Sequence, residues 1–293
     1  MKCLYHRIWL ISFLLSIFLG GIHSKAIAQA LVADTWAAAQ SKKSGLLILT
    51  YIKTPGLSFK DSYGNLDGVC FDIVKEFILY VKKTYGVQLQ AKVMPESQDF
   101  NKFMEDIKTA KGGVFGLGNI TITPEREQIY DFTPSFINNL TFLITHNSVP
   151  TLSSIQYIGS QFKGMRAYTV KSSTNEKFIL DVKQKYFPQL EIIYVPNSGV
   201  ALTKVASDNR SFTCLDFNYY AEALKFNSPI KRHPDGDNST EKLGIIMPNN
   251  NDWKPIWDQF MHENRFTKSF EYRQILINHL GISAVKALER YVD

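Results

Sequence analysis

The chain has 293 residues, of which 45% are hydrophobic and 20% are charged. This balance excludes a disordered chain, which has too few apolar residues to build a core, and a protein made of several membrane spans. The formal net charge of +6 is a reason to consider nucleic-acid binding, so the position of the basic residues has to be settled first.

The first 30 residues contain the three parts of a secretory signal peptide: a basic start, an apolar run at 8–22 and a small-residue ending at 26–30. We expect cleavage after Ala28 or Ala30. The alternative, an uncleaved membrane anchor, is disfavoured because the apolar run is short for a bilayer span. Removal of this segment takes away three basic residues and no acid, so the net charge falls from +6 to +3 and nucleic acid is not an expected partner.

Cysteine usage fits an exported protein without a lipid anchor. Cys3 precedes the apolar run instead of following the cleavage site, so we expect a periplasmic protein that is not a lipoprotein. Cys70 shares an apolar helix face, and Cys214 lies in a short apolar run that is typical of a strand. We favour two separate buried thiols over one disulfide between them.

Strands and helices are expected to alternate along the mature chain. A continuous apolar run at 46–52 is typical of a strand that is buried on both faces. Apolar positions spaced by three and four residues predict an amphipathic helix at about 71–85. The other elements predicted in this half are a helix at 34–43, a turn-rich segment at 53–68, a strand at 88–93, a helix at 100–109, a strand at 114–120 and a helix that begins at Pro124.

A second alternating series begins near residue 147. The polar stretch 233–240 is expected to be a loop, and Gly281 is expected to end the last helix. This alternation favours an α/β fold with two lobes, mainly parallel sheets and a ligand cleft between the lobes. The elements predicted here are strands at 165–170, 190–195, 212–215 and 243–247, with helices at 173–186, at 200–207, from 217, around 253–260 and around 272–280.

The segment 118–127 contains the first candidate binding residue. Thr123 is a good N-cap and Pro124 a good first helical residue, so a helix begins there. Arg126 then lies in the first turn, where a cation opposes the helix dipole. One interpretation is a surface arginine compensated by the glutamates on either side of it. The other is that Arg126 faces a cleft, where its planar guanidinium pairs with a carboxylate.

Three segments carry a resemblance to a known family. They are ITITPER at 120–126, DFTPSF at 131–136 and GNLDGVCFDIVKE at 64–76. Together they resemble the family 3 periplasmic solute-binding proteins that bind amino acids, and they are similar to the ligand-binding domain of ionotropic glutamate receptors. The resemblance covers about residues 41–282 and is more specific in the first half of the chain than in the second.

The resemblance implies a two-lobed periplasmic-binding-protein fold of type II. The first lobe would comprise residues 31–143 together with 250–293, and the second lobe, 144–249, would be inserted into it. Hinge segments are then expected where the chain crosses between the lobes, near 138–145 and near 247–251.

Residues of the first lobe would hold the amino-acid group of the ligand. By the resemblance, Arg126 would bind the α-carboxylate and the Thr121 hydroxyl would bond to the same region. The backbone carbonyl of Asn119 would accept a hydrogen bond from the ammonium group.

Residues of the second lobe would complete the site. The resemblance implies that Ser173 and Thr174 donate N–H and hydroxyl groups to the carboxylate, and a helix start is suited to an anion. The alternative is a plain capping box of Ser173 with Glu176. Asp216 would receive the ammonium group; its alternative role is an N-cap of the following helix.

The side-chain pocket departs from the family pattern. In the family an aromatic residue after the first strand commonly covers the ligand, whereas here that position falls on Thr54, with Tyr51 and Phe59 nearby. Thr54 and Tyr51 are therefore candidate contacts, but the side chain of the ligand stays undefined.

The expected function is capture of an amino acid or a related carboxylated solute by hinge closure, and its delivery to the permease of an ABC transporter. We expect a monomer with no cofactor and no catalytic residue. We also expect no metal site, because the histidines lack metal-ligand spacing. The alternative is an enzyme on the same scaffold, similar to the cyclohexadienyl and arogenate dehydratases.

Overall fold

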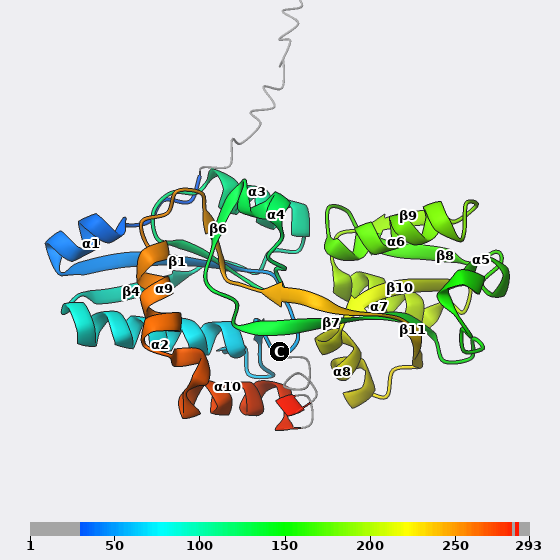
Figure 1. Cartoon of the computed structure of the whole chain (residues 1–293). Coiled ribbons are helices and arrows are strands. Elements are labelled where there is room, and N and C mark those ends of the chain that lie inside the picture. Colours follow the sequence, from blue (N-terminus) through cyan, green and yellow to red (C-terminus); the bar gives the residue numbers. More distant parts are fainter. Residues whose placement is uncertain (1–29, 283–284, 287–293) are drawn as a thin grey trace, which may run out of the picture.

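The computed structural model describes residues 30–282 and 285–286. The predicted signal peptide, apart from its last residue, lies outside the described residues. Among those described, no helix combines the length and the apolar character needed to cross a membrane. The described chain forms two lobes, each built around one five-stranded sheet (Figure 1).

The first lobe contains the sheet with the order β4-β1-β5-β12-β6. Helices from both ends of the described chain pack around it, because the segment after β12 returns to this lobe (Figure 1). Its strands are β1 (Ser44–Tyr51), β4 (Gln88–Val93), β5 (Val114–Leu117), β6 (Tyr130–Phe132) and β12 (Ile246–Pro248), with a hairpin of β2 (Phe59–Lys60) and β3 (Leu66–Asp67). Its helices are α1 (Trp36–Lys42), α2 (Val69–Tyr85), α3 (Phe100–Thr109), α4 (Pro124–Glu127), α9 (Lys254–Asp258), a π-helix (Gln259–Glu263), a 3-10 turn (Phe266–Lys268) and α10 (Phe270–Leu280).

The second lobe contains the sheet with the order β11-β7-β10-β8-β9. Its strands are β7 (Ile137–His146), β8 (Arg166–Val170), β9 (Glu191–Val195), β10 (Ser211–Asp216) and β11 (Ile230–Leu243). Its helices are a 3-10 turn (Ile155–Tyr157), α5 (Ile158–Gln161), α6 (Thr174–Lys185), α7 (Ser198–Ser207) and α8 (Phe217–Lys225). The predicted two-lobed α/β architecture is therefore confirmed.

The sheets are mixed, which corrects the expectation of mainly parallel sheets. The strands β4, β1 and β5 are parallel, as are β10, β8 and β9, and these are the strands linked by helical crossovers. The other strands, β12 and β6 in one sheet and β7 and β11 in the other, pair antiparallel. These antiparallel partners lie far apart along the chain, so the local alternation of helices and strands gives no clue to their pairing.

The predicted loop at 233–240 is wrong, because these residues belong to β11. This strand lies at the edge of its sheet and pairs with β7 through two register shifts, between His233 and Asn238 and between Asn238 and Glu241. An edge strand with bulges accommodates Pro234 and Gly236, which a central regular strand would not.

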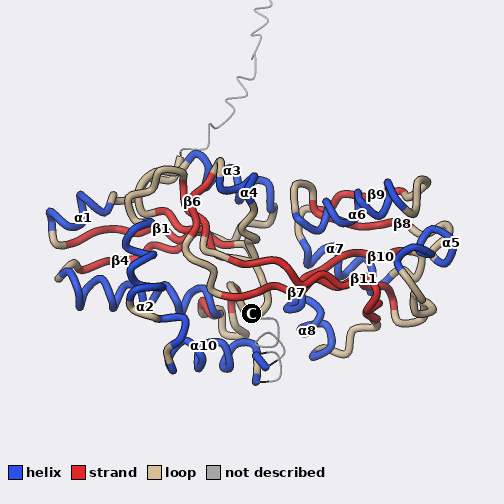
Figure 2. Tube along the Cα trace, viewed as in Figure 1, coloured by secondary structure: helices blue, strands red, loops and turns tan. Residues whose placement is uncertain are grey.

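The strands β7 and β11 run side by side from the first lobe into the second (Figures 1 and 2). The residue ranges of the two lobes remain predictions. One structural observation speaks against residue 249 as the end of the second lobe. The strand β12, which falls inside the predicted range 144–249, pairs with β5 and β6 in the first sheet. The sheet pattern thus favours a return to the first lobe after β11, earlier than the predicted crossing at 247–251.

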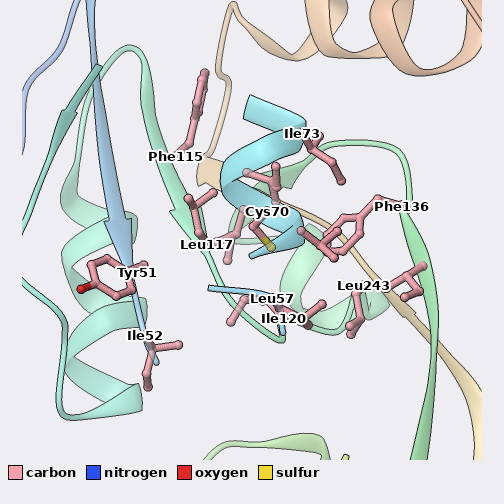
Figure 3. Close-up of a cluster of buried hydrophobic side chains, with 14 of the residues drawn as sticks. Tyr51, Ile52, Leu57, Cys70, Ile73, Phe115, Leu117, Ile120, Phe136 and Leu243 are labelled. Atoms are coloured by element: carbon pink, nitrogen blue, oxygen red, sulfur yellow. The ribbon is translucent and has the colours of Figure 1, made fainter. Parts of the chain in front are cut away.

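The core of the first lobe positions the carboxyl ends of its strands. Phe77 of α2 is fully buried and stacks on Trp257 of α9, with ring centroids 3.7 Å apart. The cluster in Figure 3 continues from this core toward the end of β1 and includes the Cys70 side chain.

Cys70 and Cys214 are both buried and free, so the prediction of two separate thiols is confirmed.

Candidate functional site

A cavity lies between the two lobes, at the carboxyl ends of β1, β5, β8 and β10. This is where open α/β sheets present functional groups, because loops that follow parallel strands meet at one edge. All the predicted site residues except Tyr51 line this cavity. The lining residues are Ile52, Thr54, Phe100, Asn119, Thr121 and Arg126 from the first lobe and Val170, Ser173, Thr174, Asn175, Asn197, Ser198, Asp216 and Tyr219 from the second.

Arg126 is positioned by the start of α4. The Thr123 hydroxyl caps this helix by accepting from the Arg126 backbone N–H at 3.3 Å, as the sequence predicts. The guanidinium donates through Nη1 to the Thr121 carbonyl at 2.9 Å and through Nη2 to the Ser172 carbonyl of the second lobe at 3.2 Å. It also lies 5.6 Å from the centroid of the Phe100 ring. Arg126 therefore faces the cleft, with N–H groups left for a further acceptor.

Asp216 supplies the negative charge on the other side of the cavity. It ends β10 and is 6% exposed. Its Oδ1 accepts from Asn139 Nδ2 at 2.6 Å and its Oδ2 accepts from Asn175 Nδ2 at 3.5 Å. Although Asp216 occupies the N-cap position of α8, its side chain makes no capping hydrogen bond. The carboxylate is thus not engaged by the helix, which is evidence against its alternative role.

Glu241 is a second acid close to this site, and the sequence analysis missed it. Its Oε2 accepts from Thr121 Oγ1 at 3.0 Å and from Asn139 Nδ2 at 2.9 Å. Asn139 is fully buried, and its Nδ2 donates to both Glu241 and Asp216. It therefore bridges the two carboxylates. The pairing of β7 with β11 and with β10, and the bridge from Thr121 to Leu243, bring these residues together, and no local signal in the sequence marks these pairings.

The two acids and the arginine affect each other's protonation. Burial, followed by the charge of Glu241, raises the pKa of Asp216 from 3.8 to about 7. Burial lowers the pKa of Arg126, and the charges of Glu241 and Asp216 oppose that change. Arginine stays protonated under these conditions. The site is therefore a compact group of one fixed cation and two acids.

The bond from Thr121 to Glu241 determines what the Thr121 hydroxyl offers to a ligand. A hydroxyl has one hydrogen, and here it is donated to an acceptor-only carboxylate. The oxygen can then only accept from the cavity. The expectation that the Thr121 hydroxyl bonds to the region of the ligand carboxylate stays a prediction; as placed here, the oxygen can accept a hydrogen bond from an ammonium group.

The start of α6 provides the donors of the second lobe. The Ser173 hydroxyl donates to the Val170 carbonyl at 2.6 Å and accepts from the Glu176 N–H at 3.1 Å, while Glu176 Oε2 accepts from the Ser172 N–H at 2.6 Å. The capping role of Ser173 is thus present, and its hydroxyl is already used. The backbone N–H groups of the next two residues, Thr174 and Asn175, have no hydrogen-bond partner among the described residues. They are the donors that this helix end offers to an anion.

Tyr51 lies outside the cavity wall, whereas Thr54 is part of it. The Tyr51 ring packs edge-on against Phe71 in the core, with centroids 5.4 Å apart, and the next residue, Ile52, lines the cavity instead. Figure 3 shows the side chains of Tyr51 and Ile52 at the end of β1. Successive side chains of a strand point to opposite faces, so only one of these two neighbours can face the ligand. The Thr54 hydroxyl donates to the Ile52 carbonyl at 3.1 Å and is 1% exposed.

The aromatic side chains at the cavity come from positions that the sequence analysis did not select. Phe100 is the first residue of α3, and Tyr219 lies in the first turn of α8. Each had a purely structural explanation as an apolar helix position.

Asn119, a predicted site residue, also lines the cavity, and its side-chain Oδ1 is buried without a partner in the described structure.

The lobes touch around the cavity. Besides the bond from Arg126 to the Ser172 carbonyl, hydrogen bonds between the lobes run from Tyr219 Oη to the Lys53 carbonyl (3.0 Å), from Asn218 Nδ2 to the Pro55 carbonyl (3.0 Å), from Asn197 Nδ2 to the Gln98 carbonyl (2.8 Å) and from the Phe100 N–H to the Pro196 carbonyl (3.0 Å).

The chemistry of the lining is that of ion pairing and hydrogen bonding. Within residues 30–282 and 285–286, no group of three His, Cys, Asp or Glu side chains is arranged to hold a metal ion. The lining offers Arg126 and the N–H groups at the start of α6 as donors, and it offers Asp216, Thr121 and Asn119 as acceptors. The arrangement suits a small molecule with an anionic and a cationic end.

Comparisons with known proteins bear on the family and the fold of the chain. The family model of bacterial extracellular solute-binding proteins, family 3, matches residues 46–280. No curated protein sequence matches the chain. Among solved structures, it is similar to an ancestral arginine-binding protein bound to arginine, with 20% identity, a TM-score of 0.65 and coverage of 80% of this chain and 98% of that one.

Two further solved structures are similar. One is the GluR0 ligand-binding core from Nostoc punctiforme in complex with L-glutamate, with 18% identity, a TM-score of 0.59 and coverage of 80% of this chain and 99% of that one. The other is the ancestral amino acid-binding protein AncCDT-1, a precursor of cyclohexadienyl dehydratase, with 18% identity, a TM-score of 0.62 and coverage of 80% and 95%. At these identities the likeness is one of fold.

Proposed function

The chain belongs to the bacterial extracellular solute-binding proteins, family 3, and from this premise we propose that it captures a free amino acid, or a closely related carboxylated solute, between its lobes. The observation that carries the proposal is that the cavity lining offers both kinds of charge. Arg126 of the first lobe and the N–H groups at the start of α6 can bind an anion, and the buried Asp216 of the second lobe can bind a cation.

The carboxylate of the ligand would bind to Arg126 and to the N–H groups of Thr174 and Asn175. The guanidinium keeps N–H groups available beyond its bonds to Thr121 and Ser172, and α6 adds the positive end of its dipole. The ammonium group would bind to Asp216. Pairing both charges of the ligand avoids the large cost of leaving a buried charge alone.

Hinge closure would couple binding to a change of shape. Arg126 and Asp216 stand on different lobes, so one ligand can touch both only when the lobes are together. A ligand shifts a conformational equilibrium only by the contacts that one state has and the other lacks. The antiparallel strands β7 and β11 run side by side between the lobes, which makes them the proposed hinge. The closed form would then deliver the solute to the permease of an ABC transporter, with the protein acting as a monomer in the periplasm.

The competing function is a dehydratase that acts on a cyclohexadienyl acid. Asp216, with a pKa near 7, has the protonation behaviour of a general acid, which is the observation that favours this candidate. The assay is incubation with a cyclohexadienyl acid, in which absorbance reports the release of an aromatic product. Product release would establish dehydratase activity, whereas an unchanged substrate would exclude it.

Thermal unfolding of the mature protein with a panel of free amino acids tests the binding function. A ligand present at one hundred times its dissociation constant stabilises the folded state by about 2.7 kcal/mol. For a protein of this size that raises the melting temperature by about 5–10 °C. If no amino acid in the panel shifts the melting temperature, amino acids are not the ligands and the proposal is wrong.

A further inference from the structure

We propose that Asn139, on the strand β7, is a positioning residue for the ligand: it holds the Asp216 carboxylate ionised beside a second acid, so that Asp216 can pair with the ammonium group. The inference rests on the proposed function and makes it more specific, since Asn139 is not among the residues that line the cavity. It is carried by the register of three strands and by the hydrogen bonds and burial of one amide group.

The strand pairing places Asn139 between the two acids. Asn139 is the register partner of Glu241 on β11, and Thr141, two residues further along β7, is the register partner of Asp216 on β10. Side chains two residues apart on a strand point to the same face of the sheet. A side chain at position 139 can therefore reach both carboxylates.

The amide group of Asn139 matches these carboxylates. Its Nδ2 donates to Asp216 Oδ1 at 2.6 Å and to Glu241 Oε2 at 2.9 Å. An amide NH₂ has two hydrogens, so one is available for each acid. The other end of the amide, Oδ1, is buried and has no hydrogen-bond partner among the described residues. Because an unpaired buried acceptor is costly, the two acids explain the orientation of this side chain better than its own hydrogen bonding does.

The surroundings of Asp216 make this donor important. Burial and the charge of Glu241 raise the pKa of Asp216, and the hydrogen bond from Asn139, followed by the longer one from Asn175, lowers it. Two buried acids without a donor between them would repel each other, and one of them would take up a proton. A protonated Asp216 has no charge to offer to an ammonium group.

The other ionisable groups around Asp216 do not take over this role. The Arg126 guanidinium of α4 attracts both acids, but its hydrogen bonds go to two backbone carbonyls. Cys214 of β10 and Tyr219 of α8 also lie near Asp216, and burial raises the pKa of both groups, so they stay neutral.

The same series of bonds reaches the first lobe. Glu241 Oε2 also accepts from Thr121 Oγ1 at 3.0 Å, and Thr121 lines the cavity. The series therefore joins a cavity residue of each lobe through Asn139 and Glu241, which lie on the two strands of the proposed hinge. Loss of Asn139 would interrupt it in the middle.

The first experiment follows the ionisation of Asp216 in the ligand-free mature protein by carbon-13 NMR of the aspartate carboxyl groups. The Asp216 signal is identified by its absence in Asp216→Asn. Asn139→Leu keeps a similar shape without a donor, and we expect the titration midpoint to rise by about one pH unit, the effect of one hydrogen bond to a charged group. Adding Glu241→Gln to this variant should lower the midpoint again, because the second charge is gone. An equal midpoint in wild type and Asn139→Leu overturns the inference.

Ligand binding at different pH values provides the second readout. With the amino acid that binds wild-type protein best, Asn139→Leu should bind about tenfold more weakly than wild type at pH 6 and almost equally at pH 9, where Asp216 is ionised in both proteins. Weakening by one constant factor at every pH would indicate a structural defect and overturn the inference, while the proposed function stands. If wild-type protein binds no amino acid, the proposed function fails, whereas the titration of ligand-free protein separately decides whether Asn139 controls Asp216.

Asn251→Leu is the matched control, because Asn251 is a buried asparagine of the first lobe that does not line the cavity. Its Nδ2 donates to the Gly112 carbonyl at 2.8 Å and its Oδ1 accepts from the Trp253 N–H at 3.0 Å. This variant should lose stability and keep the Asp216 midpoint; a shift as large as in Asn139→Leu overturns the inference. If Asn139→Leu does not fold, Asn139→Ser replaces it, since the shorter side chain cannot bridge both acids, and an unchanged midpoint there has the same meaning.

Discussion

Ligand binding is predicted to depend on pH because of the surroundings of Asp216. Burial and the Glu241 carboxylate raise the pKa of Asp216 to about 7 in the ligand-free site. An ammonium group bound against Asp216 requires the ionised carboxylate and lowers its pKa again. Binding therefore releases a proton from every molecule in which Asp216 is protonated, and the affinity increases as the pH rises through 7.

The expected size of this effect follows from the pKa. With a value near 7, about nine-tenths of the free sites are protonated at pH 6 and about one-tenth at pH 8. The affinity at pH 6 should then be lower than at pH 8 by about tenfold, which corresponds to about 1.4 kcal/mol.

The assay is titration calorimetry at pH 6, 7 and 8 in buffers with different ionisation enthalpies, which gives both the dissociation constant and the number of protons released. We expect nearly one proton to be released at pH 6 and almost none at pH 8. Glu241→Gln is the diagnostic variant: it keeps an acceptor for Thr121 and removes the neighbouring charge, so the pH dependence should move to lower pH. Equal dissociation constants at pH 6 and pH 8, with no proton release, would refute this account of Asp216.

Three other predictions concern stability and reactivity. Ser173→Ala removes the cap of α6 and should lower the free energy of unfolding by about 1 kcal/mol, measured by urea denaturation; an unchanged midpoint would contradict the capping role. Phe77→Ala removes a fully buried ring that stacks on Trp257 and should cost about 3–5 kcal/mol in the same assay, whereas a loss below 1 kcal/mol would contradict the packing. Cys70 and Cys214 should react with a thiol reagent only after unfolding, because burial raises the pKa of the Cys70 thiol to about 12 and that of Cys214 well above its usual value; rapid labelling of folded protein would contradict their burial.

The parts of the fold that the sequence predicts are those with local signals. The apolar run that forms β1 and the amphipathic spacing of α2 depend only on neighbouring residues, and both elements lie where they were expected. The start of α4 was equally predictable, since Thr123 and Pro124 have intrinsic preferences for the N-cap and the first turn. Arg126 could be selected for this reason together with the family resemblance.

The parts that the sequence did not predict depend on pairing over long distances. The strand β11 contains Pro234 and Gly236, which are typical of loops, and it is formed only because β7 offers its edge. The position of Glu241 beside Asn139 follows from the same pairing, and its position beside Thr121 follows from the bridge between Thr121 and Leu243, so neither could be found without the tertiary structure. Distinguishing Tyr51 from Ile52 likewise required knowing which face of β1 meets the cleft.

The most direct test of the central claim is the affinity of Arg126→Ala for the amino acid that binds wild-type protein best. If Arg126 pairs with the ligand carboxylate in the closed cavity, its loss leaves a buried carboxylate without its cation and costs about 3–5 kcal/mol. The account predicts that the dissociation constant measured by calorimetry rises by at least one hundredfold while the variant stays folded. A folded Arg126→Ala protein that binds the same amino acid with unchanged affinity would contradict it.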